Sequence, residues 1–221
     1  MIDTAPTATD ASKLLLVDDH PVLRQGLAKL IEGESDLTIC GEVDNAEAAL
    51  EAIEKNMPDL AIVDLSLQGK PGLGLIKEIK DRWPDLLVLV LSMHEESLWV
   101  ERVLRAGACG YVMKQEKPRE LISRIRRALK GDIALSPSMS DTLLRKMVSG
   151  RPAQPTGEES LGDREIQVLQ LLGQGHSPRE IAQMMNISTK TVDAHREHLK
   201  RKLNLESVSE LLRYATLRFA N

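Results

Sequence analysis

From Lys13 to about Lys130, the chain alternates between short aliphatic runs and longer amphipathic stretches. This alternation is typical of a parallel β-sheet whose strands are joined by crossover helices. Five runs rich in Leu, Val and Ile are candidate strands, at residues 14–17, 37–43, 60–63, 87–91 and 110–113. The amphipathic stretches predict helices at residues 22–31, 46–55, 73–82, 98–106 and 119–130. Strands that are apolar on both faces require a sheet covered on both sides, which predicts a doubly wound α/β domain with five parallel strands.

The rest of the chain follows a different pattern. Residues 137–148 are compatible with one more helix, and the sequence SGRPAQPTG at 149–157 has the Pro and Gly content of a linker. Residues 161–221 contain no strand-like run and predict four helices joined by short polar turns. We therefore expect a disordered tail at 1–12, an α/β domain at 13–130, a linker with a possible helix at 131–157 and a smaller all-α domain at 158–221.

The overall composition limits the class of protein. The 33 acidic residues outnumber the 29 basic ones, so the net charge of −4 gives no sign of nucleic-acid binding for the chain as a whole. Two Trp, two Tyr and one Phe are too few for a platform on which bases stack, so nucleic-acid contacts should go through helices. No apolar run approaches the ~20 residues that span a bilayer, and the first ten residues lack the order of a signal peptide. We expect a cytoplasmic protein without membrane contact.

Polar residues directly follow four of the five predicted strands. The first strand ends in Asp18 and Asp19, the third in Asp64, the fourth in Ser92 and the fifth in Lys114. The carboxyl ends of parallel strands meet at one edge of a sheet, where α/β proteins place their ligand sites. Three carboxylates, a hydroxyl and an ammonium are therefore expected to gather at that edge.

This set of groups favours phosphate chemistry. Neighbouring carboxylates repel one another unless a hard divalent cation binds them, and Mg²⁺ prefers such oxygen ligands. A carboxylate beside the metal can attack a phosphoryl group to form an aspartyl-phosphate, whose oxygens Lys114 and Ser92 would hold. Taken one by one, the residues also fit plain roles such as a helix cap, a turn or a surface charge. Their joint placement favours the phosphate site.

Four segments in the same part of the chain carry a family resemblance: LLLVDDHPVLRQGL, DLAIVDLSL, LVLSMH and GACGYVMK. With them, residues 13–130 resemble the receiver domain of bacterial two-component response regulators, which has a flavodoxin-like fold. The resemblance implies that Asp64 is the phosphoacceptor. It also implies that Asp18, Asp19, Asp64 and the backbone carbonyl of Ser66 hold Mg²⁺.

The resemblance extends to the residues around the phosphate. It implies that Ser92 is the switch hydroxyl that moves toward the phosphate, that Tyr111 is the aromatic that turns inward behind it, and that Lys114 binds the phosphate. A plain alternative for Tyr111 is a half-buried aromatic on the last strand. His20 and His94 lie beside the site, but accepting phosphate from a donor requires no catalytic histidine. His94 could still tune hydrolysis of the acyl phosphate.

The helical part has a core pattern of its own. Apolar residues recur at helical spacing, at Leu161, Ile166, Leu169, Leu172, Ile181, Met185, Val192, Leu199 and Leu203. Gly175 follows the first helix, Pro178 opens the second, and residues 186–188 form a tight polar turn before the third. Two helices joined by a short turn over a shared core form a helix-turn-helix, whose second helix enters the major groove of DNA.

The third helix is the candidate reader of DNA. With Val192 and Leu199 facing the core, the opposite side is centred on Lys190, Ala194, Glu197 and Arg201, with Asp193, His198 and Lys200 at its margins. The candidate DNA contacts are Lys190, Thr191, Ala194, Glu197, Lys200 and Arg201. Residues 189–202 hold five basic and two acidic side chains. From Thr156 onward, however, the chain has nine basic and nine acidic residues, so this part as a whole has no net charge. A solvated helix with mixed charges is the plain alternative. One copy should bind phosphates modestly, and a dimer would double the footprint.

LGDREIQVLQLLGQGHSPREIA, followed by ISTKTVDAHREHLKRKLNL, resembles the LuxR/NarL-type helix-turn-helix that often follows a receiver. Two reader positions that are often basic in relatives are Asp193 and Glu197 here. Either their carboxylates accept hydrogen bonds from cytosine, which alters the base preference, or they weaken binding electrostatically. The last helix, 208–219, has an apolar stripe that would either pair across a dimer or close the domain core.

Together the two resemblances identify the chain as a two-component response regulator of the NarL/FixJ family. A sensor histidine kinase would phosphorylate Asp64, and phosphorylation would drive homodimerisation or release of the domain that binds double-stranded DNA. We expect no enzyme beyond the receiver's own phosphorylation and dephosphorylation. One alternative is an aspartyl-phosphate phosphatase or phosphotransferase, although Ser66 stands where such hydrolases place a second carboxylate. Another is a receiver joined to a protein-binding helical adaptor.

Overall fold

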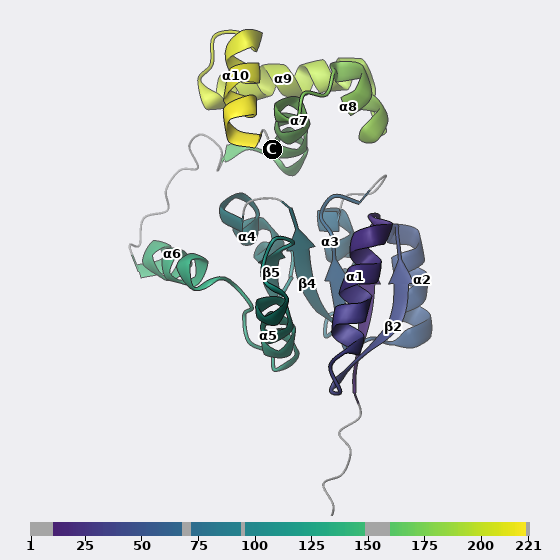
Figure 1. Ribbon diagram of the computed structural model, residues 1–221. Coiled ribbons are helices and arrows are strands. Elements are labelled where there is room, and N and C mark those ends of the chain that lie inside the picture. Colours follow the sequence, from purple (N-terminus) through teal and green to yellow (C-terminus); the bar gives the residue numbers. More distant parts are fainter. Residues whose placement is uncertain (1–10, 68–71, 94–95, 149–159, 220–221) are drawn as a thin grey trace, which may run out of the picture. The chain divides into compact units, whose positions relative to one another are not determined.

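The computed structural model describes residues 11–67, 72–93, 96–148 and 160–219. The chain divides into two compact units, Met1–Arg145 and Lys146–Asn221. The first is an α/β unit and the second is helical (Figure 1). Among the described residues, no helix combines the length and the apolar character needed to cross a membrane.

The α/β unit is built on a five-stranded sheet in which all neighbouring strands are parallel. Its strands are β1 Ser12–Val17, β2 Leu37–Val43, β3 Leu60–Val63, β4 Leu87–Ser92 and β5 Gly110–Met113. The spatial order β2-β1-β3-β4-β5 is that of a flavodoxin-like doubly wound fold, which confirms the predicted fold class. The direction of winding reverses between β1 and β3, and such a switch point is where α/β proteins place their ligand sites.

Helices cover both faces of the sheet, at α1 Pro21–Glu32, α2 Ala46–Asn56, α3 Gly72–Arg82, α4 Glu96–Arg105 and α5 Pro118–Leu129. Helices α1 and α5 share one core cluster, which includes Ile31 and Ile125. Helices α2, α3 and α4 cover the other face. All four residues of β3 are buried, because this central strand has helices on both sides, and its uninterrupted aliphatic run reflects that burial.

A short segment between α5 and α6 Pro137–Val148 lies against β5. The backbone N–H of Ala134 donates to the Cys109 carbonyl at 2.9 Å, and the Tyr111 N–H donates to the Ala134 carbonyl at 2.9 Å. Gly110 permits this approach, since a Cβ atom there would stand 2.4 Å from the Ala134 carbonyl oxygen. The segment between the two helices thus extends the edge of the sheet.

The helical unit contains α7 Asp163–Gly173, α8 Pro178–Met184, α9 Thr189–Leu203 and α10 Val208–Phe219. The predicted core residues are buried except Leu203, which is half-buried because it lies in the last turn of α9. The hydroxyl of Ser177 caps α8, and that of Ser188 caps α9 by accepting from the Thr191 N–H at 3.0 Å. The polar turn between α8 and α9 and the two capped starts produce the predicted helix-turn-helix.

Candidate functional site

Three aspartates converge at the switch point of the α/β unit. Asp18 and Asp19 follow β1, and Asp64 follows β3, the strand that pairs with β1. One side-chain atom from each of these aspartates and one from His20 lie within 4.8 Å of one another. Asp18 and Asp64 are buried, and Asp19 is partly exposed. The fold therefore brings together the carboxylates that the sequence places at this edge.

Lys114 ties two of these carboxylates together. Its Nζ atom lies 2.8 Å from Asp18 Oδ2 and 2.8 Å from Asp64 Oδ2, and its side chain is buried. Burial raises the pKa of Asp64, and the ammonium of Lys114 counteracts this only in part. An ammonium between two buried carboxylates is also positioned to hold the oxygens of a phosphoryl group on either of them.

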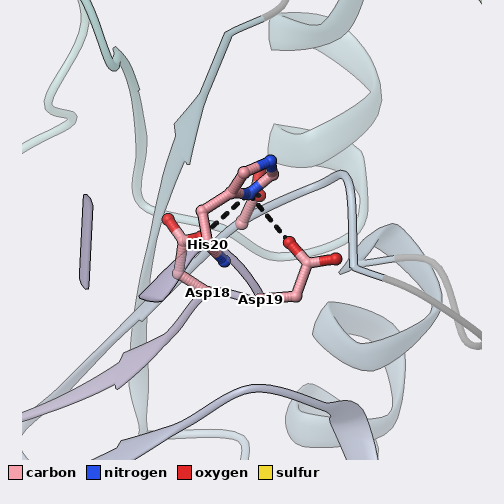
Figure 2. A group of neighbouring side chains, drawn as sticks. Asp18, Asp19 and His20 are labelled. Carbon is pink, nitrogen blue, oxygen red and sulfur yellow. Dashed lines mark hydrogen bonds and ion pairs between the residues drawn. The ribbon is translucent and has the colours of Figure 1, made fainter. Parts of the chain in front are cut away.

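His20 lies closer to the carboxylates than the sequence suggested. Its Nδ1 atom is 2.9 Å from Asp19 Oδ1, 3.2 Å from Asp18 Oδ1 and 3.8 Å from Asp64 Oδ2. Figure 2 shows the imidazole ring beside the carboxylates of Asp18 and Asp19. The only sequence signal for this placement is that His20 directly follows the aspartate pair. His94 lies outside the described residues.

The other predicted pocket residues are Ser66, Ser92 and Tyr111. The backbone N–H of Ser66 donates to Asp64 Oδ1 at 3.1 Å, so this turn faces the carboxylate. Ser92 and Tyr111 are both fully buried on neighbouring strands, and their hydroxyls are hydrogen-bonded to each other. Burial raises the pKa of Tyr111, which is therefore a neutral phenol. Tyr111 is therefore fully buried, and not half-buried as the plain alternative would have it.

The donor set fits a hard divalent cation. Asp18, Asp19 and Asp64 present only oxygen atoms, and their mutual distances allow one ion to be shared. Mg²⁺ prefers one or two carboxylates together with water and phosphate oxygens. A cation bound there would also offset the repulsion among carboxylates that Lys114 offsets only for Asp18 and Asp64. The donor atoms of these residues therefore suit Mg²⁺.

The predicted DNA contacts lie on the outward side of α9. Lys190, Thr191, Ala194, Glu197 and Arg201 are exposed, and Lys200 is half-buried. Val192 and Leu199 face the core. Lys202 is used differently, since its Nζ atom lies 2.7 Å from Glu165 Oε2 on α7 and so ties α9 to α7.

Acidic residues on α9 pair with its own basic ones. Asp193 Oδ1 lies 2.7 Å from an Arg196 guanidinium nitrogen, and Glu197 Oε1 lies 2.9 Å from Lys200 Nζ. The acidic side chains are 58% and 66% exposed, whereas those of Arg196 and Lys200 are 18% and 17% exposed. In both pairs, the group that is more exposed to solvent is therefore the carboxylate.

Comparisons with known proteins agree with both halves of this description. The family model "Response regulator receiver domain" matches residues 14–126, and "Bacterial regulatory proteins, luxR family" matches residues 159–215. The chain belongs to the two-component response regulators that join a receiver domain to a LuxR-type DNA-binding domain. This confirms the predicted family and the predicted class of function, a DNA-binding transcription regulator under phosphorylation control.

Relatives match the chain along most of its length. The oxygen regulatory protein NreC of Staphylococcus carnosus is 36% identical over 211 residues, which cover 92% of this chain and 96% of NreC. RcsB from Salmonella enterica serovar Typhimurium, bound to the rprA promoter in the presence of the phosphomimetic BeF3⁻, has a TM-score of 0.67 at 28% identity. That match covers 94% of this chain and 99% of the RcsB chain. A structure of two RcsB dimers on two parallel DNAs has a TM-score of 0.58 at 30% identity, with coverage of 94% and 98%.

Proposed function

We propose that Asp64 accepts a phosphoryl group from a phosphorylated histidine of a sensor kinase. The observation that carries this proposal is the convergence of Asp18, Asp19 and Asp64 at the switch point, with Lys114 bridging two of them. Asp18, Asp19, Asp64 and the Ser66 carbonyl would hold Mg²⁺, which when bound neutralises charge on the transferred group. Family membership supports the same assignment.

The transfer step is a displacement at phosphorus. A carboxylate oxygen of Asp64 attacks the phosphorus, the P–N bond to the donor imidazole breaks as the P–O bond forms, and the electron pair returns to the imidazole nitrogen. Lys114, already 2.8 Å from Asp64 Oδ2, donates a hydrogen bond to a phosphoryl oxygen. The hydroxyl of Ser92 donates to a second oxygen and leaves its partner Tyr111. No other side chain has to move a proton.

The output of the switch is DNA binding by α9. Lys190, Thr191, Ala194, Glu197, Lys200 and Arg201 would contact double-stranded DNA in the major groove, in keeping with the LuxR-type match. Because residues 156–221 carry nine basic and nine acidic side chains, two copies bind far better than one, so we propose that phosphorylation drives homodimerisation. The RcsB dimers on DNA support this step. Because a DNA-binding regulator acts where the DNA is, we propose a cytoplasmic location.

Sedimentation with beryllofluoride and Mg²⁺ tests the pocket directly, because this anion mimics an aspartyl-phosphate. We expect the wild-type chain to shift from monomer to dimer and the Asp64→Ala variant to stay monomeric. A matched control is Asp59→Ala, which removes an exposed carboxylate at the start of β3 instead of at its end. Dimerisation of the Asp64→Ala variant on the same addition would contradict the assignment of Asp64.

DNA binding is tested by fluorescence anisotropy with a random-sequence duplex at low salt. Arg201→Ala should weaken binding, because Arg201 is exposed on the outward side of α9. Lys55→Ala, at the end of α2 in the α/β unit, is the matched control and should leave the affinity unchanged. Failure of the beryllofluoride-loaded protein to retain any duplex would favour a protein-binding role for the helical unit.

A further inference from the structure

The segment after α5 belongs to the core of the α/β unit. Ala134 and Leu135 are buried, and Ala134 lies in the same hydrophobic cluster as residues of β1, β3 and β4. The receiver match ends at residue 126, yet the compact unit runs to Arg145. The start of the connection toward the helical unit is therefore packed against the receiver.

One contact joins this segment to the phosphate pocket through Tyr111. The Tyr111 hydroxyl is hydrogen-bonded to Ser92, while its backbone N–H donates to the Ala134 carbonyl at 2.9 Å. Gly110, directly before it, allows the two backbones to approach this closely. A single residue thus contacts both the switch hydroxyl and the connecting segment.

A second contact joins the segment to α4. Glu96, the first residue of α4, is buried, and both of its carboxylate oxygens face Ser136. The Ser136 N–H donates to Glu96 Oε1 at 3.0 Å, and the Ser136 hydroxyl donates to Glu96 Oε2 at 2.5 Å. The same hydroxyl accepts from the Met139 N–H at 3.2 Å and so caps α6. We call this pair the Glu96–Ser136 contact.

The Glu96–Ser136 contact lies a short way along the chain from the switch. Glu96 follows Ser92 by four residues, and its charge acts on the buried phenol of Tyr111, as does that of Asp64. A shift of about 1 Å at the start of α4 would lengthen the hydrogen bonds of 2.5 and 3.0 Å to the limit of hydrogen-bond geometry or beyond it. Glu96 is therefore close in sequence to the switch hydroxyl and in contact with the capping residue of α6.

Resting on the proposed function of the pocket, we propose that Glu96 is a positioning residue that couples the state of Asp64 to helix α6 through Ser136. When Ser92 turns to a phosphoryl oxygen, the start of α4 moves with it and the Glu96–Ser136 contact opens. The first turn of α6 then loses its cap, and the connection to the helical unit is freed. The structure shows the contact closed.

Thermodynamic reciprocity gives this proposal a sharp test. If the phosphate mimic shifts the contact toward its open form by a certain factor, then the open form binds the mimic more tightly by that same factor. Variants that lack the contact should therefore bind the mimic more tightly than the wild type. A residue that only stabilised the fold would leave that affinity unchanged or weaken it. Glu96→Ala and Ser136→Ala remove the contact from either side. Glu96→Gln keeps an acceptor for the Ser136 N–H, so its affinity for the mimic should lie between that of these two variants and that of the wild type.

The experiment is hydrogen exchange of the full chain during titration with beryllofluoride and Mg²⁺. Protection of peptide 60–67 reports occupancy of the pocket, and exchange of peptide 134–148 reports the contact. In the wild type, we expect exchange of peptide 134–148 to accelerate as peptide 60–67 becomes protected. In Glu96→Ala and Ser136→Ala, peptide 134–148 should exchange fast throughout the titration. Half-protection of peptide 60–67 should need a beryllofluoride concentration that is lower than in the wild type by about five-fold or more.

Glu101→Ala is the matched control, because Glu101 is an acidic residue of the same helix that pairs with Arg105. It should behave as the wild type in both peptides. An unchanged peptide 134–148 in the loaded wild type would overturn the proposal, and so would unchanged beryllofluoride affinity in both Glu96→Ala and Ser136→Ala. If peptide 60–67 is never protected in the wild type, the proposed phosphoacceptor site itself is wrong and the coupling proposal fails with it.

Discussion

The two units of the chain arrange their functional charges in opposite ways. In the α/β unit, Asp18, Asp64 and Lys114 have buried side chains that contact one another directly. On α9 of the helical unit, Asp193 and Glu197 are exposed to solvent and pair with neighbours on the same helix. Buried charges interact strongly and depend on exact partners, whereas exposed pairs contribute little and are screened by salt.

This contrast indicates where a single substitution has its effect. In the phosphate pocket, losing one group leaves another charge buried without compensation, so both stability and chemistry change together. On α9, losing one group changes the field that DNA phosphates meet, with little effect on the fold. The four variants below test this contrast, beginning with the largest expected effect.

Lys114→Met should have the largest effect. It leaves Asp18 and Asp64 buried without their ammonium, so the free energy of unfolding in EDTA should fall by about 3–5 kcal/mol. Both tryptophans, Trp83 and Trp99, lie in the α/β unit, so urea denaturation followed by tryptophan fluorescence reports on this unit alone. The exposed Lys117→Met should change the free energy little. Equal losses in the two variants would show that the bridge contributes nothing.

Glu165→Gln tests a buried charge in the helical unit. Burial by itself would raise the pKa of Glu165, but hydrogen bonds from Lys202 and the Gly162 N–H outweigh it and the pKa is lowered. At neutral pH, the variant should lose about 1.5–3 kcal/mol of unfolding free energy, since a hydrogen-bonded ion is removed.

The pH dependence of that loss has a definite sign. Because the pKa of Glu165 is lower in the folded state than its ordinary value of 4.5, the carboxylate stabilises the fold at pH values above 4.5. This stabilisation disappears as the pH falls through the folded-state pKa. The curves of wild type and Glu165→Gln should therefore converge at acid pH. Urea denaturation followed by circular dichroism at pH 7 and at pH values below 4.5 measures the difference. A gap that persists at acid pH would contradict the ionic contribution.

Much of the fold could be predicted from the sequence because its signals are local. The bounds of β2, β3, β5, α6 and α10 coincide with the predicted runs, since buried strands are continuous aliphatic segments and helices have the period of their apolar face. The gathering of Asp18, Asp19, Asp64, Ser92 and Lys114 was predictable for a topological reason. Parallel strands deliver the residues that follow them to one edge.

The remaining features depend on contacts between residues that are distant in sequence or on side-chain conformation. The pairing of Ala134 with β5 involves a segment too short to show periodicity. Glu96 and Ser136 are separated by 40 positions, and neither residue type is unusual where it stands. The position of His20 over the carboxylates and the half-exposure of Leu203 follow from the local direction of the chain. Such contacts become visible only when the fold is known.

Ser188→Ala should have a moderate effect that is confined to the reader helix. Its hydroxyl accepts from the Thr191 N–H at 3.0 Å, and loss of an N-cap of this kind lowers stability by about 1 kcal/mol. Hydrogen exchange of the first turn of α9 should accelerate, because that turn loses the cap directly. Ser209→Ala, on the exposed side of α10, is the matched control and should leave this exchange unchanged. Equal acceleration in the two variants would exclude a specific capping role.

The double variant Asp193→Asn, Glu197→Gln should have the smallest effect on stability, within about 0.5 kcal/mol, because both ion pairs are exposed. Its effect on DNA binding should be clear. Two carboxylates no longer face the phosphates, and Arg196 and Lys200 become available to them. Affinity for a random-sequence duplex at low salt should rise, and the slope of log affinity against log salt should steepen by about 0.9 for each phosphate newly contacted.

The same variant separates the two roles that the carboxylates of α9 could have. If they act only by repulsion, selection of duplexes from a random library should return the same sequence preference for wild type and variant, with tighter binding overall. If Glu197 accepts a hydrogen bond from a cytosine amino group, the preference should relax at one position while non-specific affinity changes little. Glu206→Gln removes an exposed carboxylate just beyond α9 and controls for net charge. Because that control removes one carboxylate and the double variant removes two, a gain in binding free energy half as large would locate the effect in overall charge and not in the reader helix.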